Sequence, residues 1–105
     1  MKYFVVLVTS PNRRISEKLS RGLIAGKLAA CVNILPGLRS CYWWKGKVET
    51  AREELLLIKT SQSRLSRLTQ WVRKNHPYKV CEVVALPIAA GNKLYLDWIA
   101  KSVGR

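Results

Sequence analysis

Short apolar runs alternate along the chain with stretches in which apolar residues recur every three or four positions. The runs are rich in β-branched and aromatic residues, which is typical of strands, whereas the recurring spacing is typical of amphipathic helices. The pattern predicts strands over residues 3–10, 30–44, 48–60 and 79–88. It predicts helices over residues 11–26, 61–75 and 93–103.

Each predicted helix has one apolar stripe that should face the core. The three stripes comprise Ile15, Leu19 and Leu23; Leu65, Leu68, Trp71 and Val72; and Leu94, Trp98 and Ile99. On the first helix a basic face should be solvated, made by Arg14, Lys18 and Arg21. Ser10 or Asn12 is expected to cap this helix and Ser61 the second, because their side-chain oxygens can accept from free helix N–H groups.

Residues 30–44 and 48–60 should pair as a hairpin around a tight turn at 45–47, with a bend or bulge at Pro36. The order β-α-β-β-α-β-α predicts an α+β fold. It is a ferredoxin-like βαββαβ sandwich with a C-terminal helix, in which two helices cover one face of a four-stranded antiparallel sheet. The segment LLLIKT is apolar on both faces, and CYWW is aromatic. The second face should therefore be covered through self-association.

A length of 105 residues is typical of one domain, 1–105, and 19 Lys and Arg against 6 acids give a net charge of +13. This excess is either a solvated cationic surface or a means of attracting nucleic acid, anionic lipid or acidic metabolites. The apolar run YFVVLV is shorter than a signal core, and no segment reaches the roughly 20 apolar residues of a membrane span. A soluble protein of the cytoplasm is expected.

The sequence contains few residues that could carry catalysis. Cys31, Cys41 and Cys81 cannot all pair, which suits a reducing compartment. One histidine permits a Cys–His pair, but no spacing demands it. Glu49, Glu53 and Glu54 should pair with bases on the hairpin, and phosphate-binding glycine loops are absent. No enzymatic activity is predicted, and the strand motif of sequence-specific RNA platforms is missing.

The stretch HPYKVCE holds the single histidine, His76, close to Cys81 and Glu82. Imidazole, thiol and carboxylate are all metal ligands, so a metal site is one hypothesis. The alternative is that His76 ends the second helix and bonds a carbonyl of its last turn. If the strand is regular, Cys81 and Glu82 point to opposite sheet faces, so at most one of them can join His76.

Five blocks of the sequence stand out together: KLAACVNILPG, CYWWKGKVE, LLLIKT, HPYKVCEVVALP and GNKLYLDWI. In order and spacing they resemble the CutA family, the divalent-cation tolerance proteins, and the resemblance covers residues 3–103. It implies a PII-like homotrimer that pairs strands between subunits and has a role in tolerance of copper and other divalent metals. It implies no established enzymatic activity. Animal members are linked to the localisation of acetylcholinesterase, which would make another protein a partner.

The resemblance also implies which residues line the clefts between protomers. They are Lys59, His76, Tyr78, Glu82 and Trp44, with Trp98 as support. Some bacterial members bind copper through a first-strand Cys and a His–His pair, and here those positions are Val8 and Asn75–His76. Copper should therefore bind weakly, mostly through His76, with Cys81 as a soft partner. The alternative function is a structural trimer that recruits a protein or an anionic partner.

Overall fold

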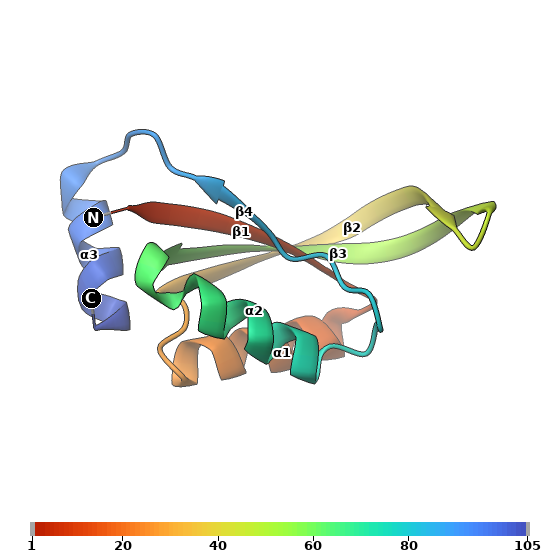
Figure 1. Cartoon of the computed structure of the whole chain (residues 1–105), viewed down its shortest axis with the longest axis horizontal. Coiled ribbons are helices and arrows are strands. Elements are labelled where there is room, and N and C mark those ends of the chain that lie inside the picture. Colours follow the sequence, from red (N-terminus) through yellow and green to blue (C-terminus); the bar gives the residue numbers. More distant parts are fainter. Residues whose placement is uncertain (1, 105) are drawn as a thin grey trace.

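The computed structural model describes residues 2–104, which form one sheet, three α-helices and a short 3₁₀ turn. The elements are β1 (Tyr3–Ser10), α1 (Arg13–Ala25), β2 (Cys31–Trp44), β3 (Lys47–Ser61), η1 (Gln62–Arg64), α2 (Leu65–Asn75), β4 (Val84–Pro87) and α3 (Lys93–Val103). The four strands are antiparallel in the order β2-β3-β1-β4. Figure 1 shows α1 and α2 side by side under one face of the sheet. The predicted α+β class, element order and antiparallel sheet are confirmed.

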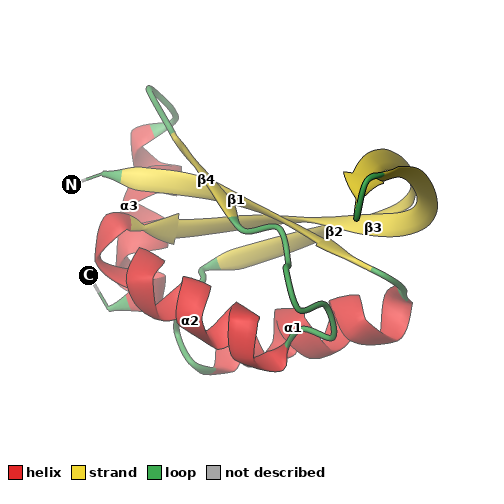
Figure 2. Ribbon diagram, turned by 45° about the vertical axis from the view of Figure 1, so that its right-hand side comes forward, coloured by secondary structure: helices red, strands yellow, loops and turns green. Residues whose placement is uncertain are grey.

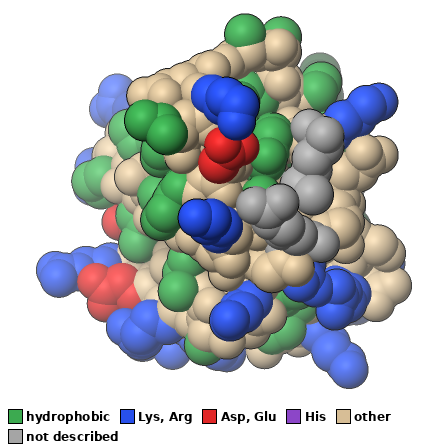
Figure 3. All heavy atoms as spheres, turned by 90° about the vertical axis from the view of Figure 1, so that its left-hand side faces the viewer, with side chains coloured by type: hydrophobic (Ala, Val, Ile, Leu, Met, Phe, Trp, Pro, Cys, Tyr) green, Lys and Arg blue, Asp and Glu red, His purple; other side chains and the backbone are tan. Residues whose placement is uncertain are grey.

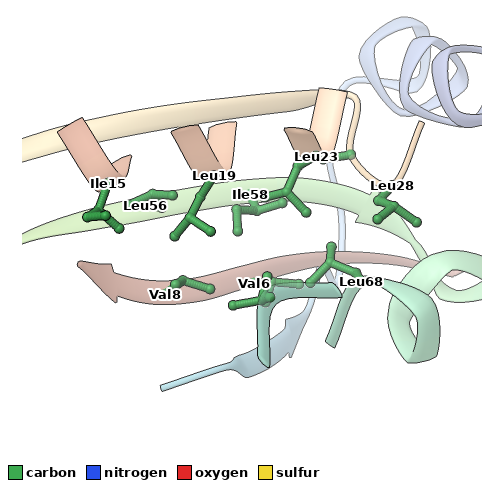
Figure 4. Packing of buried hydrophobic residues seen from close by; sticks show 11 residues of the cluster. Val6, Val8, Ile15, Leu19, Leu23, Leu28, Leu56, Ile58 and Leu68 are labelled. Atoms are coloured by element: carbon green, nitrogen blue, oxygen red, sulfur yellow. The ribbon is translucent and has the colours of Figure 1, made fainter. Parts of the chain in front are cut away.

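The core lies between that face and the two helices. Strand alternation directs Val6, Val8, Leu56 and Ile58 toward the helices, and all four are fully buried. They meet the apolar stripes of α1 and α2, which Figure 4 shows from close by. The buried members of these stripes are Ile15, Leu19, Leu23, Leu68 and Val72. Among the described residues, no helix is long and apolar enough to cross a membrane.

The opposite, outer face of the sheet is also apolar. Leu7 pairs with Leu57 on β3 and with Val84 on β4, so these three side chains share this face. Leu35 and Leu86 lie on the same face, and they and Val84 are each 46% exposed. The two-faced apolar character predicted for LLLIKT is therefore confirmed, and the chain's own helices α1 and α2 leave this outer apolar face uncovered.

The long hairpin of β2 and β3 extends beyond the helices and curls at its tip (Figures 1 and 2). The expected irregularity at Pro36 is a bulge between Leu35 and Leu38. The tight turn uses Lys45 and Gly46, both with positive φ, which is the turn geometry that suits a two-residue hairpin.

Two of the predicted boundaries are wrong. The last strand was expected over 79–88 but covers only Val84–Pro87, because residues 76–83 leave the edge of β1 and pack Cys81 and Val83 against the core. Ser61 does not cap α2: its hydroxyl bonds Ser63, and η1 intervenes. Asn12, one of the two expected caps of α1, accepts from the N–H of Ile15 at 2.9 Å.

The predicted inner stripe of α3 is wrong in part. Leu94 is 80% exposed and Trp98 45% exposed, whereas Ile99 is fully buried as expected. The buried stripe is instead Ile99, Ala100 and Val103, in the second half of the helix. Only this half packs against the sheet, since α3 lies at its end and contacts β3 (Figure 1).

The helices α1 and α2 pack closely at Gly22, where there is no room for a side chain. A Cβ at this position would lie 2.2 Å from Cζ2 of Trp71. We expect Gly22→Ala to destabilise the fold by about 1–3 kcal/mol, although alanine favours a helix by about 1 kcal/mol over glycine. Thermal unfolding measures this. The control is Gly91→Ala, whose Cβ would make ordinary contacts with Leu96 at 3.5 Å. A Gly22→Ala variant as stable as the parent would contradict the packing described.

Candidate functional site

His76 joins the end of α2 to the end of β1. It is the C-cap of α2, is 7% exposed, and has its Nε2 2.7 Å from the carbonyl oxygen of Thr9. Its Nδ1 lies 3.1 Å from the backbone nitrogen of Tyr78, whose N–H donates to it. Because a carbonyl can only accept, Nε2 carries the ring proton and donates, and the imidazole is neutral.

Both ring nitrogens of His76 are thus engaged by the backbone, and neither has a lone pair left for a metal. The arrangement matches the structural role weighed from the sequence, although the carbonyl belongs to β1 and not to the last turn of α2. Cys81 is half-buried against the core and Glu82 is exposed, so they point apart as strand alternation suggested. A copper site made of His76 and Cys81 does not fit this conformation.

Tyr78 connects His76 to a buried carboxylate. Its ring lies 4.7 Å from that of His76, and its hydroxyl donates to Oε2 of Glu53 at 2.8 Å. Burial, and then the bond to Glu53, raise the pKa of Tyr78 well above its usual value, so the phenol remains a donor. Glu53 was expected to pair with a base, and this prediction is wrong. Its acceptor oxygen meets a phenol because residues 76–83 fold back over β3.

Glu82 completes an acidic cluster with Glu53 and Tyr78. Glu82 is exposed as a whole residue, but partial desolvation of its carboxyl, and then repulsion by the charge of Glu53, raise its pKa above the usual range. The oxygens of the two carboxylates are the donors that hard divalent cations prefer. No group of three or more His, Cys, Asp or Glu within residues 2–104 could hold a metal ion. The two carboxylates alone do not make up such a group.

Lys59 belongs to a second group, the lysine cluster, formed with Cys31, Asn33, Tyr95 and Trp98. Lys59 pairs with Cys31 across β2 and β3, and its ammonium donates to Oδ1 of Asn33. The Cys31 thiol donates to the same oxygen at 3.7 Å. Burial, and then the neighbouring Cys31, raise the pKa of Tyr95, and its ring lies 5.4 Å from that of Trp98. The cluster therefore carries one cation among partly exposed aromatic rings.

The residues expected in one cleft lie in three places in this chain. His76, which lies beside Tyr78 of the acidic cluster, bonds Thr9, whereas Lys59 is opposite Val5, four residues and about 13 Å back along β1. Trp44 lies at the tip of the hairpin, 44% exposed, with the ammonium of Lys45 5.8 Å from its ring centre. His76 contacts Tyr78, and Glu82 lies near Glu53, to which Tyr78 donates. Trp98 reaches the lysine cluster only through Tyr95, whose ring it contacts.

Glu53 was missed as a site residue because its partner is far away in sequence. A carboxylate on an exposed hairpin normally pairs with a neighbouring base, and Arg52 is adjacent to it. Only the fold shows that Tyr78 reaches it. The sequence offered one weak indication of this pairing: the chain has few acids, and Glu53 and Glu82 are two that the single HPY segment could approach.

The chain is 55% identical over 98 residues to the chloroplastic CutA 1 protein of Oryza sativa, covering 93% of this chain and 55% of the relative. It is 47% identical over 100 residues to the divalent-cation tolerance protein CutA of Thermus thermophilus, covering 95% and 97%. The chain spans only about half to two-thirds of the length of its plant and Xenopus laevis relatives.

Solved structures agree with these sequence relationships. The crystal structure of CutA1 from Oryza sativa superposes with a TM-score of 0.94 at 53% identity, covering 97% of this chain and 94% of that chain. The Thermus thermophilus protein superposes with a TM-score of 0.93 at 46% identity, covering 95% and 97%. Residues 4–102 match the family described as CutA1 divalent ion tolerance protein. The chain therefore belongs to the CutA1 divalent ion tolerance family, as the sequence motifs indicated.

Proposed function

We propose that this protein is a non-enzymatic homotrimer of divalent-cation tolerance, whose ligand sites form where protomers meet. The observation that carries the proposal is the separation of the acidic and lysine clusters on a sheet whose outer face is apolar and uncovered. A neighbouring protomer can supply both missing parts: a cover for the face and the other half of the site.

The exposed part of the outer apolar face supports self-association. Leu35, Val84 and Leu86 are branched aliphatic side chains, each 46% exposed on a regular sheet. Transfer of such area from water contributes roughly 25 cal/mol per Å², and a stable interface covers about 800 Å² per partner. The trimeric number and the PII-like arrangement rest on the family resemblance.

Charge complementarity supports a composite site. Lys59 contributes a cation at one end of the sheet, and Glu53 with Glu82 contributes carboxylates near the other. In an assembly the lysine cluster of one protomer would face the acidic cluster of the next, with Trp44 and Trp98 as apolar walls. Such a cleft would accept a ligand with both a cationic and an anionic group, or a divalent cation with its counter-anion.

A divalent cation in this cleft would bind to the oxygens of Glu53 and Glu82, while His76 positions Tyr78 from behind. Copper(II) and harder divalent cations both accept carboxylate ligands.

The second candidate function is that of an interaction trimer that recruits a protein or an anionic partner. It is favoured by the aromatic tip of the hairpin, where Trp43 is 75% exposed and Tyr42 43% exposed. Aromatic side chains of this kind are enriched at protein interfaces. Retained cation binding after desalting distinguishes the first function from this one.

The assembly is tested by light scattering during gel filtration, which should report about three times 12.0 kDa. Leu86→Lys places a charge on the outer apolar face and should dissociate or destabilise the trimer. The control is Leu94→Lys, because Leu94 is 80% exposed on α3 and should tolerate the change. A parent protein that remains a stable monomer at micromolar concentration would overturn the proposal.

The cation site is tested by titrating copper(II) and manganese(II) into the parent and three variants. Glu82→Gln should weaken binding roughly tenfold or more, because it removes a charged ligand. His76→Ala should mainly lower stability, by about 1–3 kcal/mol, because it strands the Thr9 carbonyl and the Tyr78 N–H. Cys81→Ser should leave binding unchanged. If Glu82→Gln bound the cation normally and a folded, trimeric His76→Ala variant did not bind it, His76 and not Glu82 would be the metal ligand.

The pH dependence of binding provides a further check. The pKa of Glu82 is raised, so this carboxyl takes up a proton at a higher pH than usual. A cation competes with that proton, so affinity should fall as the pH is lowered through the mildly acidic range. Glu82→Gln should flatten this dependence. An equally steep profile in that variant would show that another group controls binding.

A further inference from the structure

A groove on the helical layer lies apart from the cation site. It runs along the outer side of α2 and the segment that follows it, and its cavity measures about 550 Å³. The residues that line this α2 groove are Arg67, Gln70, Trp71, Arg73, Lys74 and Lys79. Four of the six are cations, and the other two are an amide and an indole.

The four cations of the α2 groove are not neutralised by the protein. The salt bridges within residues 2–104 join Arg13 and Arg21 to Glu17, and Lys93 to Asp97. None involves a groove cation. Four like charges around one concavity repel one another, and an anion bound between them would relieve that repulsion. The groove is therefore prepared for a partner that carries several negative charges.

Trp71 gives the α2 groove an aromatic surface between the charges. Part of its ring lies against Gly22 of α1, where a side chain would collide with it, and the half-buried remainder lines the groove. Lys18 lies one helical turn before Gly22 and is exposed, so the cationic surface continues onto α1. In Figure 3, Lys and Arg side chains gather along the lower part of the molecule, where the helical layer lies.

We propose that the α2 groove binds single-stranded nucleic acid without sequence preference. Cations that follow a phosphate backbone beside an aromatic ring that can contact a base are the arrangement by which proteins hold single strands. Binding to a lipid surface requires exposed apolar side chains next to the cations, whereas the one large apolar group of this site is half-buried.

This proposal does not depend on the cation site or on the trimer. The α2 groove lies on the helical layer, and the outer apolar face lies on the other side of the sheet (Figure 2). An assembly that covers the outer face leaves the groove accessible. In a trimer the grooves would be repeated, and one strand could occupy more than one of them with increased avidity.

The number of cations predicts the salt dependence. Four contacts to a single strand give a slope of log affinity against log salt of about −2.8, since each phosphate contributes about −0.7. Affinity should then fall about 50-fold between roughly 50 and 200 mM salt. No preference among oligonucleotides of equal length is expected, because backbone contacts carry no sequence information.

The experiment measures fluorescence anisotropy of a labelled oligouridylate with the full chain at several salt concentrations. The groove variant is Arg67→Gln with Lys79→Gln, and the control is Lys2→Gln with Lys101→Gln, which removes the same charge from exposed positions elsewhere. The groove variant should lose roughly tenfold or more in affinity at low salt, and its slope should become shallower by about 1.4. The control should stay within about twofold of the parent.

Three results would overturn the proposal: no binding by the parent at low salt, equal losses in the two variants, or binding only to anionic phosphatidylserine vesicles. Equal losses would mean that only the net charge of +13 attracts the oligonucleotide. Thermal unfolding confirms that each variant is folded. Should the groove variant unfold, Arg73→Gln with Lys74→Gln removes two other groove cations and carries the same expectations.

Discussion

The structure depends on a sheet that is apolar on both faces, of which α1 and α2 cover only one. On the inner face, Val6, Val8, Leu56 and Ile58 are fully buried under α1 and α2. On the outer face, Leu7 and Leu57 continue the same strands with side chains of the same kind. A sheet of this composition does not favour an isolated monomer, because aliphatic area left in water costs free energy that association recovers. If association covers this face, it also brings residues of two protomers together, which is why we propose a site shared between protomers.

The fold could be predicted largely from the sequence because its elements are strongly periodic. Pro36 marked the bulge, Lys45–Gly46 the hairpin turn, and the spacing of Leu19 and Leu23 the inner side of α1. The errors occurred where tertiary contacts decide. Pairing of β4 with β1 ends at Leu7, because residues 76–83 pack Cys81 and Val83 on the core and His76 bonds Thr9, which shortens β4. The first turn of α3 is exposed because it extends past the end of the sheet.

The candidate site was predictable only in part. The HPY segment is a predicted site, but the state of His76 depends on the Thr9 carbonyl, 67 residues away. Glu53 belongs to the candidate site because the hydroxyl of Tyr78 donates to it, and no local sequence pattern indicates this contact. The net charge of +13 follows directly from the sequence. The gathering of four cations around Trp71 could be seen only in the structure, where Trp71 packs against Gly22.

Zero-length carbodiimide coupling tests most directly the claim that the site is shared between protomers. Protein labelled with ¹⁵N would be unfolded and refolded together with unlabelled protein, coupled, digested, and analysed by mass spectrometry. Lys59 lies in the lysine cluster and Glu82 in the acidic cluster, and mixed isotope labels in one coupled product show that the amide joins two protomers. The account predicts a Lys59–Glu82 product in which light and heavy peptides are mixed. A trimer that yields this product only within like-labelled peptides, or not at all, would contradict it.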